Sequence, residues 1–229
     1  MTSLFFIHGA GCTKNVWEAQ LSAFPGSYAT TLPGHHSARP ARAATIAAFA
    51  DAVAEELRAR GTAGTVLCGS SMGGAIALEL ALRENLPIAG IVLIGSGARL
   101  RVAPQLFESL EADFAGASRT LARQFFAQPT PERIDAAVAE MLRVGREQTL
   151  RDFHACDAFD VTDRVGRLRI PLLAMTGEHD VLTPSKFSQW LADRVSGARA
   201  RILPGAGHLA MIERPAETNA ALAAFMAHP

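Results

Sequence analysis

Short apolar segments alternate with longer amphipathic segments along most of the chain. Runs rich in β-branched and aromatic residues end in glycine-rich turns, and each is followed by apolar residues at helical spacing. This alternation is typical of a parallel sheet flanked by helices, and therefore of an α/β fold. The predicted strands cover residues 4–7, 65–68, 91–94, 170–175 and 200–203. Their near-continuous hydrophobicity predicts burial on both faces.

The segments between these strands are predicted to be covering helices. Apolar residues recur in them at steps of three and four positions, and glycine or proline lies at several of their ends. The predicted helices cover residues 45–60, 75–82, 186–195 and 216–228.

Residues 98–166 interrupt the alternation, because they contain helical patterns and no convincing strand. The apolar stripes are Leu106, Leu110 and Phe114, then Leu121 and Phe125, then Ile134, Val138 and Met141. Because strands resume beyond this stretch, we expect a helical lid and not a separate domain. The predicted division is an α/β core made of residues 1–97 and 167–229, with a lid at residues 98–166.

Composition excludes several classes of function. The 229 residues include 22 basic and 22 acidic side chains, and this balance gives no electrostatic argument for a nucleic-acid or anionic-membrane partner. Three cysteines without a close pair argue against disulfides, and no His or Cys spacing matches a zinc site. We expect no metal and no cofactor. Without a signal peptide or an apolar stretch of about 20 residues, the expected location is the cytoplasm.

The sharpest motif is Gly69-Ser-Ser71-Met-Gly73, a G-x-S-x-G sequence at a strand-to-helix transition. A serine at such a turn adopts a strained backbone conformation, and small residues on either side prevent collisions. A turn that serves packing alone is the other interpretation. A dinucleotide site is disfavoured, because the glycine spacing does not match G-x-G-x-x-G.

A serine nucleophile needs a base and an acid, and two later loops supply candidates. His208 follows the strand 200–203, and Asp180 follows the strand 170–175. The order Ser71, Asp180, His208 is that of the α/β-hydrolases, and all three residues are expected at the carboxyl ends of strands, where ligands of such sheets bind. Alternative acids are Glu178 and the cluster Asp157, Asp160 and Asp163.

A fourth element is the loop Phe6-Ile-His8-Gly-Ala10-Gly-Cys12, which also follows a strand. Acyl transfer creates an oxyanion that backbone N–H groups can stabilise. One donor is expected to be the N–H of Met72, and the other is expected from this loop. His8 is the rival base, although its position favours a structural hydrogen-bonding role.

These four motifs resemble the α/β-hydrolase superfamily over nearly the whole chain. Within it they are most similar to small esterases such as the pimeloyl-carrier-protein methyl-ester esterases, and to the 3-oxoadipate enol-lactonases. The resemblance implies a Ser71, Asp180, His208 triad with oxyanion donors at Ala10 and Met72. Members usually begin with an extra β-hairpin that this sequence lacks, so an N-terminally truncated sheet is expected. Many also carry Asp-x-Pro-Gly-His-Gly-x-Ser, where this chain reads Thr31-Leu-Pro-Gly-His35-His36-Ser37.

The remaining histidines and the lid are predicted to have ordinary structural roles. His35 and His36 are expected on a surface loop, His154 in the lid and His228 at a frayed end, while His179 should point away from the site. Most lid aromatics should be core contacts, and a minority are expected to line an acyl pocket. We favour a solvated helix face for Arg133, Arg143, Arg146 and Arg151. The alternative is a docking surface for an acyl carrier protein or a carboxylate-bearing substrate.

The sequence therefore predicts a serine hydrolase that cleaves a small-molecule carboxylic ester through an acyl-enzyme intermediate. Thioesterase, enol-lactonase and carbon–carbon bond hydrolase are rivals that use the same triad. A hydrolase-fold protein that binds a small molecule without turnover is the alternative outside the enzymes.

Overall fold

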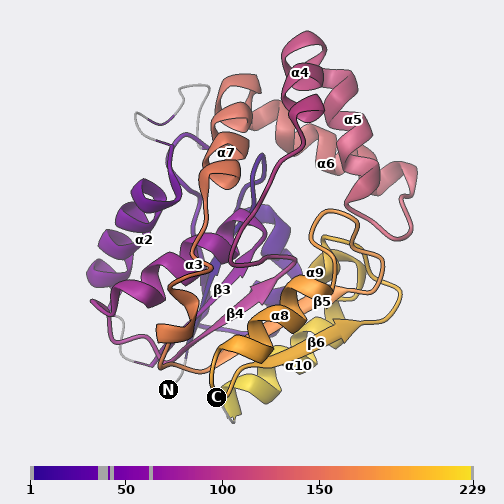
Figure 1. Ribbon diagram of the computed structural model, residues 1–229. Helices are drawn as coiled ribbons and strands as arrows, with labels where there is room; N and C mark the ends of the chain where they lie inside the picture. The colour runs from indigo at the N-terminus through magenta and orange to yellow at the C-terminus, as the bar shows by residue number, and fades with distance from the viewer. Residues whose placement is uncertain (1–2, 36–40, 42–43, 62–63, 228–229) are drawn as a thin grey trace.

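A parallel six-stranded sheet forms the centre of the computed structural model, which describes residues 3–35, 41, 44–61 and 64–227 (Figure 1). The strand order is β2-β1-β3-β4-β5-β6, and every neighbouring pair is parallel. The strands are β1 (Ser3–Ile7), β2 (Tyr28–Ala29), β3 (Thr65–Ser70), β4 (Gly90–Ile94), β5 (Leu172–Gly177) and β6 (Arg199–Leu203).

Helices cover both faces of this sheet, as the alternating sequence pattern predicts. The α-helices are α1 (Glu18–Ala23), α2 (Ile46–Arg60), α3 (Met72–Arg83), α4 (Pro104–Ala112), α5 (Phe114–Gln124), α6 (Pro131–Val144), α7 (Arg146–Ala158), α8 (Lys186–Arg194), α9 (Ala210–Glu213) and α10 (Pro215–Ala227). Two short 3-10 helices are η1 (Lys14–Trp17) and η2 (Val165–Arg167).

Alternate residues of each central strand enter different halves of the core. Phe5, Leu67 and Ile91 pack with α2 and α3 on one face. On the other face, Phe6 and Val92 pack with residues of α5, α6 and α10. Because both sides of a strand are buried, the strands read as continuous apolar runs, and the predicted α/β architecture is confirmed.

Two strands depart from the sequence prediction. The pattern gave no sign of β2, because two residues are too short for any periodicity to show. Strand β6 is present as predicted, but the expected burial on both faces is wrong for it, since Arg199, Arg201 and Ile202 are all exposed. Strand β6 lies at the edge of the sheet, where one neighbour is missing and polar side chains reach solvent.

Helices α4 to α7 lie between β4 and β5 in the chain and sit together at one end of the sheet (Figure 1). The first predicted stripe is divided, because Asp113 accepts a hydrogen bond from Gly116 N–H and so caps a new helix that begins at Phe114. The pattern also missed α7. Its buried face includes Gln148, Thr149 and Asp152, so hydrophobic periodicity could not reveal it.

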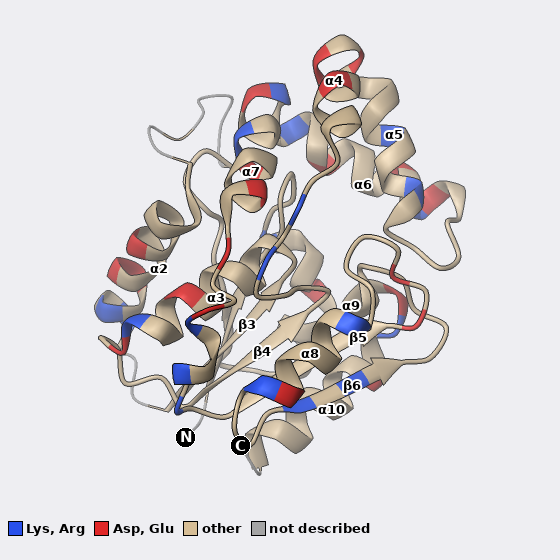
Figure 2. Ribbon diagram, viewed as in Figure 1, with Lys and Arg blue, Asp and Glu red and all other residues tan. Residues whose placement is uncertain are grey.

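Charged side chains of both signs are interspersed over the elements in Figure 2, and neither sign dominates this view. In the described part of the chain, no helix combines the length and apolarity needed to cross a membrane.

Candidate active site

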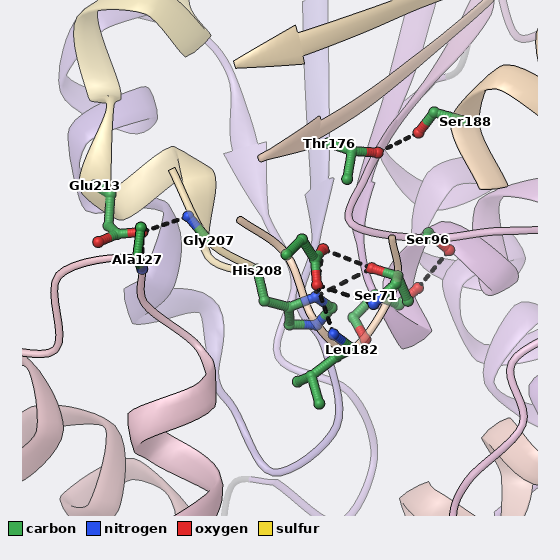
Figure 3. A network of polar contacts seen from close by, with 11 residues as sticks. Ser71, Ser96, Ala127, Thr176, Leu182, Ser188, Gly207, His208 and Glu213 are labelled. Atoms are coloured by element: carbon green, nitrogen blue, oxygen red, sulfur yellow. Dashed lines mark hydrogen bonds and ion pairs between the residues drawn. The ribbon is translucent and has the colours of Figure 1, made fainter. Parts of the chain in front are cut away.

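Ser71 occupies the turn between β3 and α3, where the sequence places the nucleophile. Its backbone has φ 52° and ψ −117°, a conformation that side-chain-bearing residues rarely adopt. The turn is held by Ser71 N–H, which donates to Ile94 O at 2.9 Å. It is also held by the Ser96 hydroxyl, which donates to Ser71 O at 2.8 Å (Figure 3). Ser71 is half-buried, so the strained turn presents its side chain at the surface of a cavity.

Two glycines allow this turn to pack against its neighbours. A Cβ on Gly69 would overlap the backbone of Gly73 and Gly74, and a Cβ on Gly73 would lie 2.7 Å from His8 O and closer still to Ile7 O. Backbone atoms cannot yield as a flexible side chain can. Both glycines are therefore required by the close approach of β1, β3 and α3, as the motif predicts.

His208 and Asp180 form a buried pair beside the turn. Asp180 Oδ2 lies 2.9 Å from His208 Nδ1, and the exposed fractions of the two side chains are 0% and 5%. Asp180 also accepts hydrogen bonds from Leu182 N–H and Thr183 N–H, each at 2.9 Å, through Oδ1. Burial alone raises the pKa of Asp180, but the charge of the neighbouring His208 and the hydrogen bonds outweigh it and leave that pKa below its usual value.

Ser71 and His208 line one cavity of about 730 Å³, together with Gly9 and Ala10 of the loop after β1. Apolar side chains from the helices α4, α5 and α7 and from the loops complete its walls, among them Leu106, Leu121, Phe125, Phe153 and Leu182. Only Phe125 and Phe153 of the predicted lid aromatics line it, in keeping with the expectation that most would be core contacts.

The loop after β1 lies directly against the Ser71 turn. A Cβ on Gly9 would come within 3.2 Å of Ser71 Cβ, so this backbone passes as close as a glycine allows. Met72 is the first residue of α3, where the N–H has no partner within the helix. The structure thus brings together all five residues that the sequence assigns to the site.

The family model of the "Alpha/beta hydrolase family" matches residues 4–221 of the chain. The protein belongs to the α/β-hydrolase family.

Relatives of this α/β-hydrolase are esterases and other hydrolases. A pimeloyl-acyl-carrier-protein methyl ester esterase from Neisseria meningitidis is 27% identical over 237 residues, which cover 96% of this chain and 90% of that protein. A solved structure titled a thermophilic esterase is 33% identical with a TM-score of 0.88 and covers 97% of this chain and 88% of that one. A second structure, titled an N-acyl homoserine lactone degrading enzyme, is 26% identical with a TM-score of 0.85 and covers 98% and 93%. The predicted resemblance and the hydrolase class are confirmed.

The rival acids of this hydrolase lie elsewhere. Glu178 has a side chain that is 53% exposed, and it accepts a hydrogen bond from Gly205 N–H at 2.9 Å. Asp157 accepts from Val102 N–H, and Asp160 accepts from Thr162. Asp180 is the carboxylate that contacts the ring of His208.

His8 has the structural contacts that the sequence predicts. Its Nδ1 lies 2.9 Å from Gly9 O, and its Nε2 accepts a hydrogen bond from Leu32 N–H at 3.0 Å. A neutral ring with its proton on Nδ1 satisfies both contacts.

The prediction that His35 is a surface residue is wrong. Only 2% of His35 is exposed, because Asp152 of α7 lies over it and gives its ring a buried carboxylate partner. His179 is exposed beside Glu178, and His154 is exposed on α7 with its ring stacked on Phe107. The predictions for His36 and His228 fall outside the described residues.

Two residues that hold the site together escaped the sequence analysis. The Thr183 hydroxyl donates to Asp180 Oδ2 at 2.7 Å and lies 3.1 Å from His208 Nδ1. The Glu213 carboxylate accepts from Gly207 N–H at 2.6 Å and from Ala127 N–H at 3.0 Å, so it joins the His208 loop to the segment before α6 (Figure 3). The Glu-Arg-Pro sequence that follows the His208 loop was the available signal for Glu213.

The described residues contain no group of three or more His, Cys, Asp or Glu side chains arranged to hold a metal ion. The three cysteines are buried thiols, and burial raises the pKa of Cys12, which also lines the cavity, to about 12. The Cys12 thiol is therefore protonated and a poor nucleophile at neutral pH.

Replacing Gly73 with alanine is expected to destabilise this hydrolase by about 1–3 kcal/mol, because the new Cβ must displace the backbone of β1. The matched control is Gly166→Ala, whose new Cβ would meet only Arg194 O at 3.7 Å, an ordinary contact. Urea unfolding of the two variants beside the wild type measures the difference. Equal midpoints for all three proteins would contradict the packing argument.

Proposed function

We propose that this α/β-hydrolase cleaves carboxylic esters of small or medium acyl groups through an acyl-enzyme intermediate on Ser71. The observation that carries the proposal is the 2.9 Å contact between Asp180 and His208, because His208 lines the same cavity as Ser71. The three residues follow three different parallel strands, β3, β5 and β6. They therefore lie at the carboxyl ends of the strands, where substrates of such folds bind.

Each residue has a defined role in this reaction. His208 accepts the hydroxyl proton of Ser71 while Ser71 Oγ attacks the ester carbonyl carbon, which becomes tetrahedral. The N–H groups of Ala10 and Met72 hold the resulting oxyanion. The carbon–oxygen bond of the ester then breaks, and His208 gives the proton to the departing alkoxide. Water repeats the sequence on the acyl-enzyme, releasing the acid and restoring Ser71.

Asp180 keeps the His208 ring in the tautomer that can act as a base. Its carboxylate accepts from Nδ1–H, which leaves the Nε2 lone pair for the proton of Ser71. Because the pKa of Asp180 is lowered, the carboxylate is ionised at neutral pH and stabilises the imidazolium that forms during the reaction.

The cavity supports a small or medium acyl group. Its volume of about 730 Å³ is within the range of about 300–1,000 Å³ that is usual for small-molecule sites. Apolar walls formed by Leu121, Phe125 and Phe153 suit a hydrocarbon chain. The polar side chains Gln105, Asp113 and Gln124 also line it and suit a substrate with a polar group beyond the acyl chain.

Lactone hydrolysis is the second candidate, since one structural relative carries a lactone-degrading title at 26% identity. Thioester and carbon–carbon bond cleavage use the same groups. A panel of p-nitrophenyl esters, acyl thioesters and lactones separates ester, thioester and lactone cleavage from one another. We expect the highest kcat/KM on the p-nitrophenyl esters. Turnover of lactones alone would replace the proposal with a lactonase.

A fluorophosphonate probe tests the nucleophile without a known substrate. We expect stoichiometric labelling of the wild type, with the label on the peptide that contains Ser71, because only an activated serine reacts readily. A folded wild-type protein that stays unlabelled and turns over no member of the panel would indicate a binding protein.

Carrier-protein recognition is a finer possibility, since one relative is named for an acyl-carrier-protein ester. Arg143 and Arg151 each pair with a glutamate of their own helix, which favours a solvated face for them, whereas Arg133 pairs with the buried Glu213. Comparing a methyl ester on an acyl carrier protein with the same ester on a small thiol tests docking. Equal kcat/KM for the two substrates would exclude it.

A further inference from the structure

A second histidine–carboxylate pair lies buried next to the proposed active site, and the proposed mechanism does not use it. His35 Nε2 is 2.8 Å from Asp152 Oδ2, and neither side chain is exposed. His35 precedes the gap in the described residues at 36–40, whereas Asp152 lies on α7. Burying a charged pair costs desolvation free energy, so the contacts of this buried pair must compensate for that cost.

Both ring nitrogens of His35 face acceptors. Nε2 faces the Asp152 carboxylate, and Nδ1 lies 3.1 Å from Pro33 O. A carbonyl oxygen and an ionised carboxylate only accept, so with Asp152 ionised the two contacts are satisfied together only when both ring nitrogens carry protons. His8, whose ring centroid is 4.7 Å away, differs because one of its nitrogens meets a donor. The contacts therefore favour an imidazolium at His35 and a neutral ring at His8.

Asp152 connects this ion pair to the loop that contains Ala10. The same Oδ2 atom that meets His35 accepts a hydrogen bond from Gly11 N–H at 2.9 Å. Gly11 has φ +62° and follows Ala10 directly, so this bond fixes the turn on which the Ala10 N–H is presented. The other carboxylate oxygen accepts from Gln148 Nε2 at 2.7 Å, and Gln148 in turn accepts from Ala41 N–H.

We propose that the His35–Asp152 ion pair is a positioning device that holds the loop Gly9–Gly11 in its oxyanion-binding geometry only while His35 is protonated. This inference rests on the proposed function, because it assigns a task to the Ala10 N–H. When His35 loses a proton, one of its nitrogens presents a lone pair to an acceptor, and the buried Asp152 loses the cationic partner that it has among the described residues. The carboxylate is then expected to shift, and Gly11, which donates a hydrogen bond to it, shifts with it.

The surroundings of the pair set the direction of the pH effect. Burial alone lowers the pKa of His35, but the hydrogen bond and charge of Asp152, with the carbonyls of Pro33 and Leu32, raise it above 6.5 overall. Among the described residues, the other titratable groups nearby are His8 from the loop after β1 and the thiols of Cys12 and Cys156. Both thiols stay protonated at neutral pH, because burial and acidic neighbours raise their pKa values. Helix α2 contributes the apolar ring of Phe49.

A raised pKa means that the ion pair is intact at low pH and is lost as the pH rises through the pKa of the folded state. Activity should therefore decline on the alkaline side of the pH profile as His35 loses its proton.

Steady-state kinetics from about pH 6 to about pH 10, on either side of the histidine pKa, test the inference with two variants and a control. His35→Gln retains a donor near the Nε2 position but cannot titrate. We expect its kcat to be about tenfold lower, part of the 10² to 10³ that one oxyanion donor is worth, with KM nearly unchanged and no alkaline decline. Asp152→Asn should lower kcat at least as far. His154→Gln, on an exposed residue of the same helix, should match the wild type.

An alkaline decline in His35→Gln equal to that of the wild type would overturn the inference, and so would an effect confined to KM. Nitrogen-15 NMR of the histidine rings gives a readout that needs neither substrate nor a folded variant at position 35. At about pH 7, we expect one buried histidine ring of the wild type to have both nitrogens protonated. If every buried ring is singly protonated there, the inference fails whether or not esters are cleaved. If no ester is cleaved, the proposed function fails instead.

Discussion

Alanine in place of Ser71 is expected to lower kcat for ester hydrolysis by about a millionfold, the scale on which a serine hydrolase depends on its nucleophile. The substitution removes the attacking oxygen and little else. The contacts that shape the turn, from Ser71 N–H to Ile94 O and from Ser96 to Ser71 O, use backbone atoms of residue 71 and survive the change. Alanine is a side-chain-bearing residue like serine, so the strain at φ 52° is unchanged.

The neighbouring residue offers a matched control. The hydroxyl of Ser70 is buried and has no hydrogen-bond partner among the described residues. Ser70→Ala should therefore retain ester turnover within a few-fold and react with the fluorophosphonate probe, whereas Ser71→Ala should do neither. Circular dichroism of both variants shows that the fold is retained. Wild-type rates in purified Ser71→Ala would remove Ser71 from the mechanism.

Sequence reasoning could place the α/β core because both faces of the central strands are buried, which produces unmistakable apolar runs. It could place Ser71 and Asp180 because each follows such a run, and His208 because a glycine-rich turn follows the predicted strand segment at the edge of the sheet. The catalytic roles of these residues stay proposals. The expected truncation of the sheet and the boundaries of the lid at residues 98–166 also stay predictions.

Contacts between distant polar residues were beyond the same reasoning. His35 and Asp152 are separated by 117 positions, and the helix that carries Asp152 buries polar side chains where a hydrophobic pattern would be expected. Glu213 lies on a helix of four residues, too short for periodicity. Burial of a polar side chain depends on a partner, and a partner far along the chain leaves no local mark.

These polar contacts connect the segment of helices α4 to α7 to both sides of the site. Asp152 holds the loop after β1 through Gly11, while Glu213 holds the His208 loop and the segment before α6 through backbone N–H groups. A shift of the helices relative to the sheet would therefore disturb the oxyanion loop and the base together.

Asn in place of Asp180 is expected to lower kcat by about 10⁴-fold, because the orientation of the new amide is dictated by its neighbours. Oδ1 of Asp180 accepts from Leu182 N–H and Thr183 N–H, and only the amide oxygen can replace it there. The amide nitrogen must then take the Oδ2 position and donate toward His208 Nδ1. This stabilises the tautomer with its proton on Nε2, which cannot accept the proton of Ser71.

Glu178→Gln is the matched control for this variant. It neutralises a carboxylate two positions earlier, on an exposed side chain that meets Gly205 N–H and not His208. We expect its kcat to lie within a few-fold of the wild type, and its fluorophosphonate labelling rate to be unchanged, while Asp180→Asn is slow in both assays. A tautomer effect acts on the proton transfer, so KM should change little in Asp180→Asn. If Glu178→Gln loses activity and Asp180→Asn keeps it, Glu178 is the acid and the contact of Asp180 with His208 is structural.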